Sequence, residues 1–176
     1  MKHPSLVLLS GAHDAGKSVT CHHLMEQARR MGRQTAGILS PGIYTQGRKT
    51  GIAAMDAKTE EYRILASLRN EDDPDGIQTI HWTFDKSAID WGNGVLADAC
   101  PCDILLVDEL GPLELTRGEG WQAGLAALDS RAYRVAVAVI RPELLAQAFA
   151  RFAPCMTLTI ASPGEKDAVV DFLLEL

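Results

Sequence analysis

The chain has 176 residues, of which 47% are hydrophobic and 23% charged. This content, with a mean hydropathy of -0.01, excludes a disordered chain, and every apolar run is shorter than the roughly 18–20 residues of a membrane span. The net charge of -6 argues against non-specific binding to nucleic acid or to anionic membranes. Four cysteines without a C-x-x-C pair, and a start that lacks a secretory signal pattern, predict a cytoplasmic protein.

The first third of the chain predicts a strand, a helix and a second strand. Residues 6–9 form a short, continuous apolar run that is typical of a strand buried on both faces. Apolar residues then recur at helical spacing from Gly16 to Met31, and Gly32 is suited to follow the end of that helix. Residues 35–39 are predicted as the next strand.

The middle of the chain has a different pattern. Residues 44–65 predict an antiparallel hairpin or meander, because Gly47, Gly51 and the turn at residues 57–59 interrupt short apolar stretches. The alternation over residues 77–84 predicts one further strand. Residues 85–99 are compatible with a helix, although Gly92 and Gly94 weaken it.

The second half alternates regularly between strands and helices. Its strands are predicted at residues 103–107, 134–140 and 156–160, and its helices at residues 121–128, 145–152 and 169–176. Such alternation predicts a mainly parallel sheet flanked by helices. Since there is no linker, the expected organisation is one α/β domain over residues 1–176, with an antiparallel hairpin insertion at about residues 42–66.

Residues 11–18 read GAHDAGKS, which matches the phosphate-binding loop (P-loop, or Walker A motif) G-x-x-x-x-G-K-[ST]. A buried strand directly before it and an amphipathic helix directly after it make the match specific. The glycines let the backbone amides point inward, and the helix start places a partial positive charge at the phosphates. The predicted nucleotide-binding residues are Gly11, Ala12, His13, Asp14, Ala15, Gly16, Lys17, Ser18 and Val19.

Two of these residues have chemical roles beyond backbone binding. Lys17 can bring its ammonium to the β- and γ-phosphates of a nucleotide, which makes it a predicted catalytic residue. Ser18 offers a hydroxyl to Mg²⁺. The motif therefore predicts a P-loop NTPase fold that binds a magnesium–nucleotide complex.

Residues 103–109, DILLVDE, form an apolar strand that ends in two acids, as in a Walker B motif. At the carboxyl end of a parallel strand, Asp108 would hold Mg²⁺ and Glu109 would act as general base on water. The two motifs lie about 90 residues apart, which leaves room for at least one strand between them. This spacing, with the glutamate after the aspartate, resembles the additional-strand, catalytic-glutamate division of P-loop NTPases.

Three basic residues are weaker candidates. Arg141 follows the strand at 134–140 and could stabilise charge on the transferred phosphoryl group, or it could simply begin the next helix. Arg48 and Lys49 lie in the predicted hairpin, where they could reach the phosphates or could be solvated surface charges. Glu114 could hold a loop or the metal shell, against the alternative of a surface carboxylate.

The run VDELGPLEL at residues 107–115 is more particular than a general Walker B motif. It resembles the signature of the small THEP-type nucleoside-triphosphatases, the family that includes the human cancer-related nucleoside-triphosphatase. Residues 36–43 (AGILSPGI) and 47–52 (GRKTGI) are similar to that family's second strand and hairpin. The resemblance implies slow, Mg²⁺-dependent hydrolysis of nucleoside triphosphates with several bases, in which the P-loop binds phosphates, Asp108 the metal and Glu109 the water.

Two other functions stay open at this stage. A small nucleotide or metabolite kinase could use the same scaffold, although an arginine-rich lid is not evident and Glu109 favours water as the acceptor. A nucleotide-dependent switch that acts through a partner would share slow turnover. The expected partner is a nucleoside triphosphate, such as ATP or GTP, and not a membrane or nucleic acid.

Overall fold

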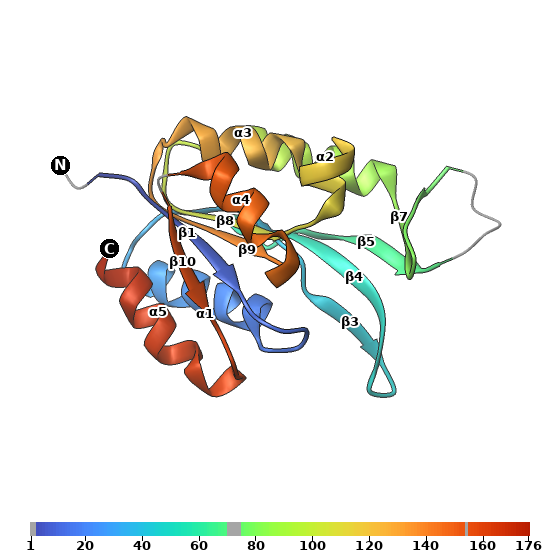
Figure 1. Ribbon diagram of the computed structural model, residues 1–176, viewed down its shortest axis with the longest axis horizontal. Coiled ribbons are helices and arrows are strands. Elements are labelled where there is room, and N and C mark those ends of the chain that lie inside the picture. Colours follow the sequence, from blue (N-terminus) through green and yellow to red (C-terminus); the bar gives the residue numbers. More distant parts are fainter. Residues whose placement is uncertain (1–2, 70–74, 154) are drawn as a thin grey trace.

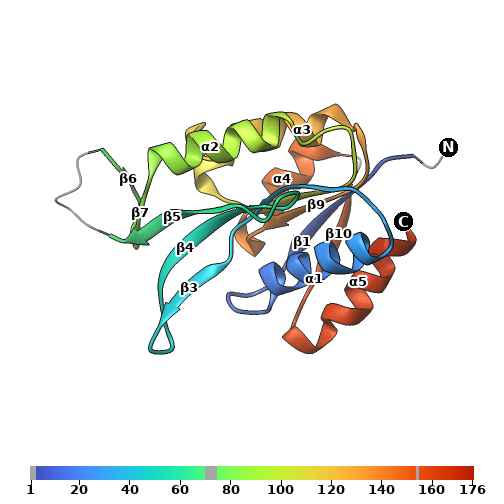
Figure 2. The same ribbon diagram turned by 180° about the vertical axis from the view of Figure 1, so that it is seen from behind.

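The computed structural model describes residues 3–69, 75–153 and 155–176. These residues form an α/β structure in which one mixed sheet lies between two layers of helices (Figure 1). Helices α2 (Lys86–Ala97), α3 (Gln122–Ser130) and α4 (Leu145–Phe152) cover one face. Helices α1 (Lys17–Arg30) and α5 (Lys166–Glu175) cover the other, as the opposite view also shows (Figure 2). The α/β prediction is confirmed.

Five parallel strands form one half of the sheet, in the order β10-β1-β9-β8-β2. Their bounds are β1 (Ser5–Ser10), β2 (Thr35–Leu39), β8 (Cys102–Leu110), β9 (Tyr133–Ile140) and β10 (Met156–Thr159). Strand β9 separates β1 from β8, although it follows β8 in the sequence, so the spacing between the two motifs does not by itself predict it. Because the strands are parallel, their carboxyl ends all reach one edge of the sheet, where the loops that follow them meet.

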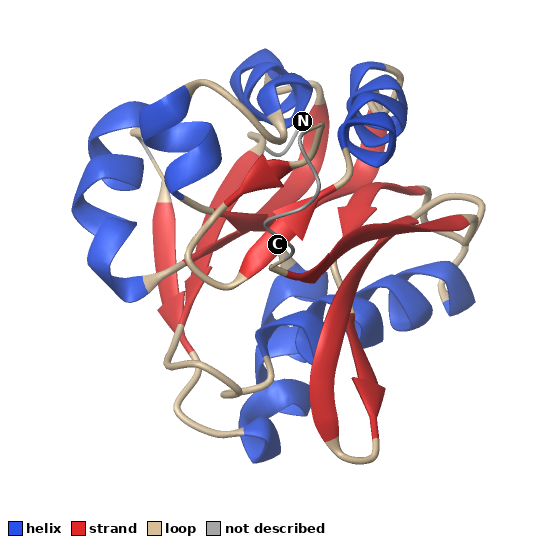
Figure 3. Ribbon diagram, turned by 90° about the vertical axis from the view of Figure 1, so that its right-hand side faces the viewer, coloured by secondary structure: helices blue, strands red, loops and turns tan. Residues whose placement is uncertain are grey.

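The other half of the sheet is antiparallel and continues from β2 through β4, β5, β7 and β6, with β3 paired to β4. Its strands are β3 (Gly42–Thr45), β4 (Arg48–Asp56), β5 (Tyr62–Leu68), β6 (Ile77–Gln78) and β7 (Trp82–Phe84). Hairpin β3–β4 projects from the body of the protein (Figure 3).

The prediction of one continuous strand over residues 77–84 is wrong, because a turn divides it into β6 and β7. The Thr79 hydroxyl accepts a hydrogen bond from the backbone N–H of Trp82 (3.1 Å) and donates one to the Trp82 carbonyl (3.0 Å). A threonine side chain that binds neighbouring backbone groups offers an alternative to the strand ladder, and apolar alternation does not reveal it.

The central strands bury both of their faces. In β1, Leu6 and Leu8 pack into the core beneath α2, α3 and α4, while Val7 and Leu9 pack into the core beneath α1 and α5. All four side chains are almost completely buried. Short apolar runs therefore formed the central strands, as predicted. No helix among the described residues combines the length and the apolar character needed to cross a membrane.

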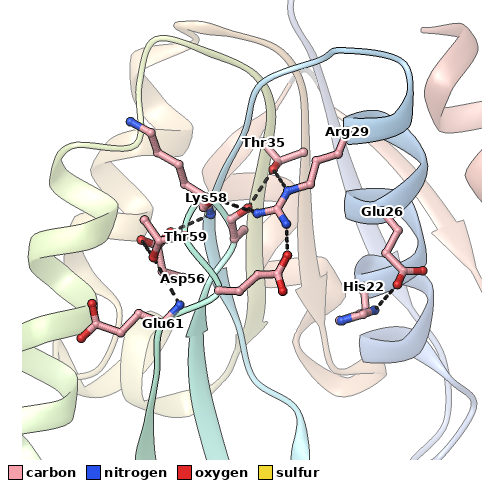
Figure 4. Close-up of polar contacts among 10 residues, drawn as sticks. His22, Glu26, Arg29, Thr35, Asp56, Lys58, Thr59 and Glu61 are labelled. Carbon is pink, nitrogen blue, oxygen red and sulfur yellow. Dashed lines mark hydrogen bonds and ion pairs between the residues drawn. The ribbon is translucent and has the colours of Figure 1, made fainter.

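Arg29, in the last turn of α1, connects that helix to the turn that joins β4 to β5 (Figure 4). Its guanidinium donates hydrogen bonds to the Ala57 and Lys58 carbonyls, both at 2.8 Å, and to the Thr35 hydroxyl at 3.2 Å, and it pairs with Glu60. The helix that follows the P-loop is thus tied to the antiparallel half of the sheet.

We predict that Arg29→Ala lowers the free energy of unfolding by about 2 kcal/mol, because partly buried carbonyls lose a charged donor. Urea unfolding monitored by circular dichroism measures the change. Arg30→Ala removes the same charge from an exposed position in the same helical turn and is the control. Equal midpoints for the two variants would contradict the conclusion that the hydrogen bonds of Arg29 stabilise the fold.

Candidate active site

Four segments meet at the carboxyl edge of the parallel strands. They are the P-loop after β1, Ser40 after β2, the acids at the end of β8, and Arg141 after β9. Two segments that are distant in the sequence, the P-loop and the acidic pair, are therefore brought to the same edge by parallel pairing.

Two glycines allow the P-loop to follow its path. Gly11 has φ +152°, and a Cβ atom at this residue would lie 2.3 Å from the Ile160 carbonyl oxygen, so the loop runs directly against the segment after β10. Gly16 has φ +96° in the left-handed region at the cap of α1. The helix has no side-chain cap and no acid in its first turn. Its amides are thus available to an anion.

The Lys17 ammonium lies across this loop. It donates hydrogen bonds to the carbonyl oxygens of Gly11 (2.8 Å) and Ala12 (2.6 Å). At the tip, His13 and Asp14 contact each other at 2.9 Å and are exposed, and Val19 is exposed on the first turn of α1. The described contacts give His13 and Val19 no chemical role beyond the backbone that they contribute.

Asp108 is fully buried at the end of β8 and is held by Ser40. The backbone N–H of Ser40 donates to Asp108 Oδ2 (3.0 Å), and the Ser40 hydroxyl donates to the Asp108 carbonyl oxygen (3.1 Å). No motif in the sequence predicts a role for Ser40. The signal available was its position directly after a strand that pairs in parallel with the Walker B strand.

Burial raises the pKa of Asp108 from an ordinary value of 3.8 to about 6. The negative charge of Glu109 acts in the same direction, whereas the Ser40 amide, the nearby Ser18 hydroxyl and the Lys17 ammonium favour the ionised form. The contribution of Ser18 and Lys17 places the P-loop beside this carboxylate. A further positive charge at this site would therefore stabilise the ionised form of Asp108.

The residues present fit a magnesium ion. Asp108 Oδ1 is buried and accepts no hydrogen bond within the described part of the chain. It lies near the Ser18 hydroxyl, and both are oxygen ligands of the kind that Mg²⁺ prefers. The same described part contains no cluster of three or more His, Cys, Asp or Glu side chains that could hold a metal alone.

Glu109 has an unusual backbone at the strand end. Its φ is +68°, and the pairing of β8 with β9 shifts register between Val107 and Leu110. Bulges of this kind redirect side chains, and a strained non-glycine residue often marks a functional site. Its Oε1 accepts a hydrogen bond from Arg141 Nη2 at 2.9 Å. Arg141 thus contacts the predicted base.

Glu114 is buried and supports the loop that follows Glu109. Its Oε2 accepts from the Gly111 N–H (2.7 Å) and its Oε1 from the Trp121 N–H (3.0 Å). Burial raises the pKa of this carboxyl, although both amides oppose the shift. Of the two roles considered for it, the contacts are those of a loop support. The alternative of a plain surface carboxylate is wrong.

The hairpin residues make other contacts. Arg48 is exposed, and the Lys49 ammonium lies 5.7 Å from the centre of the Trp82 ring. Trp82 in turn lines a cavity of about 400 Å³ that also reaches Ser40, Glu109 and Arg141. A cavity therefore adjoins Glu109, the predicted general base.

Comparison with known proteins identifies a family. A family model described as NTPase matches residues 6–171. Among curated proteins, a nucleoside-triphosphatase THEP1 from Ignicoccus hospitalis is 28% identical over 145 residues, which is 81% of each chain. Proteins of the same name from Methanothermobacter thermautotrophicus (27%, 64% of each chain) and Pyrococcus abyssi (29%, 63% of this chain and 61% of that one) also match.

Solved structures match the fold. The solution structure of a human cancer-related nucleoside triphosphatase has a TM-score of 0.71 and 16% identity, covering 97% of this chain and 96% of the other. The crystal structure of THEP1 from Aquifex aeolicus has a TM-score of 0.70 and 13% identity, with 97% of each chain covered. At these identities the likeness concerns the fold.

We predict that Asp108→Asn stabilises the unliganded protein at pH 8. The pKa of Asp108 is higher in the folded than in the unfolded chain, so the ionised carboxylate is destabilising above pH 6, and this cost disappears as the pH falls toward 4. A shift of about two pKa units corresponds to at most about 3 kcal/mol. The Asn carbonyl oxygen can still accept from Ser40.

Urea unfolding at pH 8 and pH 4.5 tests this, with the gain expected to be clearly larger at pH 8 than at pH 4.5. Asp103→Asn, near the start of the same strand, controls for the change of net charge. An Asp108→Asn protein that is less stable than the wild type at pH 8 would disprove the cost of the buried carboxylate.

Proposed function

The chain belongs to the family of THEP1-type nucleoside-triphosphatases, and from this premise we propose that it hydrolyses nucleoside triphosphates to diphosphates and phosphate in a Mg²⁺-dependent reaction at the edge described above. The observation that carries the proposal is the buried Asp108, with one unpartnered oxygen, beside Ser18 and Lys17 of the P-loop. Slow turnover and acceptance of several bases form part of the same proposal.

Binding begins with the P-loop. Its amides and the uncapped start of α1 bind the phosphate oxygens. The Lys17 ammonium then leaves the Gly11 and Ala12 carbonyl oxygens and donates its hydrogen bonds to the β- and γ-phosphates. Ser18 and Asp108 are the residues that would hold Mg²⁺, which when bound neutralises charge on the phosphate oxygens. The four cysteines are free thiols, which supports a cytoplasmic location for this reaction.

Glu109 is the proposed general base. Its backbone is bulged at the strand end, beside the edge where the terminal phosphate would lie, and the carboxylate is only partly buried, so water can reach it. Arg141 holds this carboxylate at 2.9 Å and is the cation available to charge developing on the transferred group. Water then attacks the γ-phosphorus and passes a proton to Glu109. The bond between the γ-phosphorus and the oxygen of the β-phosphate breaks, and the diphosphate leaves with that oxygen.

We predict that Glu109→Gln lowers phosphate release at least about 100-fold, because the amide cannot take a proton. Release is measured with Mg²⁺ and each of the four ribonucleotides, and nucleotide affinity by calorimetry. Affinity is expected to stay within about threefold, since the P-loop is unchanged. Glu143→Gln, on an exposed residue two positions after Arg141, is the control. Full turnover in Glu109→Gln would remove Glu109 from the mechanism.

Lys17→Ala is expected to weaken nucleotide binding at least about tenfold, because the loss of one charged hydrogen bond corresponds to about 1.5–3 kcal/mol. Lys86→Ala is a matched control, since Lys86 is also the first residue of a helix. Calorimetric titration with the magnesium complex of ATP gives both affinities. Identical affinities for the two variants would refute phosphate binding by the P-loop lysine.

A further inference from the structure

The cavity beside Glu109 lies outside the P-loop. None of its lining residues belongs to positions 11–19. It extends from Ser40, Glu109 and Arg141 away from the P-loop and toward the antiparallel half of the sheet. If a triphosphate binds with its terminal phosphate at Lys17 and Asp108, this cavity lies beyond that phosphate, and the triphosphate does not fill it. Its volume of about 400 Å³ is within the usual range for small-molecule sites.

The walls of the cavity are mostly apolar and aromatic. They come from β4, β5 and β7, which lie in the antiparallel half of the sheet (Figure 2), from α2, and from the loop after β8 that Glu114 supports. The apolar lining residues are Ile52, Leu65, Ile80, Trp82, Phe84, Ile89, Leu113 and Trp121. Ile52, Leu65 and Trp121 are almost fully buried. Rings from two sides favour a flat apolar body.

Two arginines of the cavity keep hydrogen-bond donors that their present partners do not use. The carboxylates of Glu109 and Glu114 already accept hydrogen bonds, from Arg141 and from two backbone amides. Arg117 pairs with Glu119 at 2.7 Å and donates to the Gln78 carbonyl. A guanidinium has five N–H donors, so Arg117 and Arg141 retain donors for a further acceptor. This polarity complements an anionic or acceptor-rich substituent.

We propose that the cavity is a second small-molecule site, which takes a flat apolar ring system with an anionic substituent. Its occupant lies beside Glu109 and limits the entry of water to the terminal phosphate. The effect on water rests on the proposed hydrolysis, whereas binding does not. The cavity adjoins the proposed catalytic site and shares Glu109 and Arg141 with it, but no P-loop residue lines it.

The probe for binding is 1-anilinonaphthalene-8-sulfonate, a flat aromatic anion, titrated into the full chain by calorimetry. We expect one site per chain. Leu65→Trp fills the cavity and should weaken affinity at least about tenfold. Ile64→Trp adds the same ring to an exposed position of the same strand and should bind as the wild type does. Circular dichroism checks that both variants fold.

Arg117→Gln tests the anionic substituent independently of any packing change. It should weaken binding of the sulfonate about fivefold or more, and leave unchanged the binding of N-phenyl-1-naphthylamine, the neutral analogue. If Leu65→Trp does not fold, this comparison still decides the proposal. Equal losses for both dyes, or a loss for neither, would overturn the anion preference.

The functional arm measures phosphate release at saturating sulfonate dye. We expect release to fall about tenfold in the wild type and to be insensitive to dye in Leu65→Trp. An unchanged wild-type rate would contradict the proposal that the occupant limits the entry of water to the terminal phosphate. Displacement of the dye by free adenosine or guanosine would show that the cavity binds the nucleotide base, and would contradict the proposal of a second small-molecule site. Dye binding without any turnover would refute the proposed hydrolysis, whereas turnover with equal dye binding in all variants would refute only the second site.

Discussion

The arrangement depends on one costly feature, a carboxylate removed from water at the carboxyl edge of a parallel sheet. Asp108 is fully buried and burial raises its pKa to about 6, so the unliganded fold carries an electrostatic cost. The Ser40 amide offsets part of it, and Ser18 and Lys17, from the P-loop, each offset a smaller part. The remaining oxygen has no partner in the described chain. A cation supplied with a phosphate ligand would lower this cost, so stability and ligand binding are coupled at a single side chain.

Strand order makes that coupling possible. Strand β9 lies between β1 and β8, so the P-loop and Asp108 emerge two strands apart at the same edge. Ser40 reaches Asp108 from β2, on the other side of β8. The antiparallel extension then continues from β2, and the Arg29 contacts tie its first turn to α1. Arg29 and the turn that joins β4 to β5 therefore connect the helix after the P-loop to the two strands that form part of the cavity wall.

The sequence was sufficient for the features that are local. Continuous apolar runs predicted the central strands, and the GAHDAGKS and VDE runs predicted which residues reach the edge, because each pattern is carried by adjacent residues. Ser40 and Glu114 were harder. Ser40 acts on a residue 68 positions away, and the carboxylate of Glu114 binds amides whose positions depend on the folded loop. The cavity combines several strands and loops, which no single window of sequence contains. The turn at Thr79, which ends β6, depends on a hydrogen bond from the Trp82 backbone to the Thr79 side chain. The alternation of apolar residues continues through this turn and therefore does not reveal it.

Arg141 illustrates why residue type alone does not determine role. Its position after β9 suits an arginine that meets phosphate, yet its observed partner is Glu109. The two assignments are compatible on energetic grounds. Both side chains are partly exposed, and such ion pairs contribute about 0–1 kcal/mol, whereas guanidinium–phosphate contacts are frequently bidentate. In the proposed reaction, a terminal phosphate would therefore draw Arg141 from Glu109 at little cost and leave this carboxylate free to accept a proton from water. The weakness of the ion pair is what suits it to this edge, because a strongly held arginine would keep the base occupied.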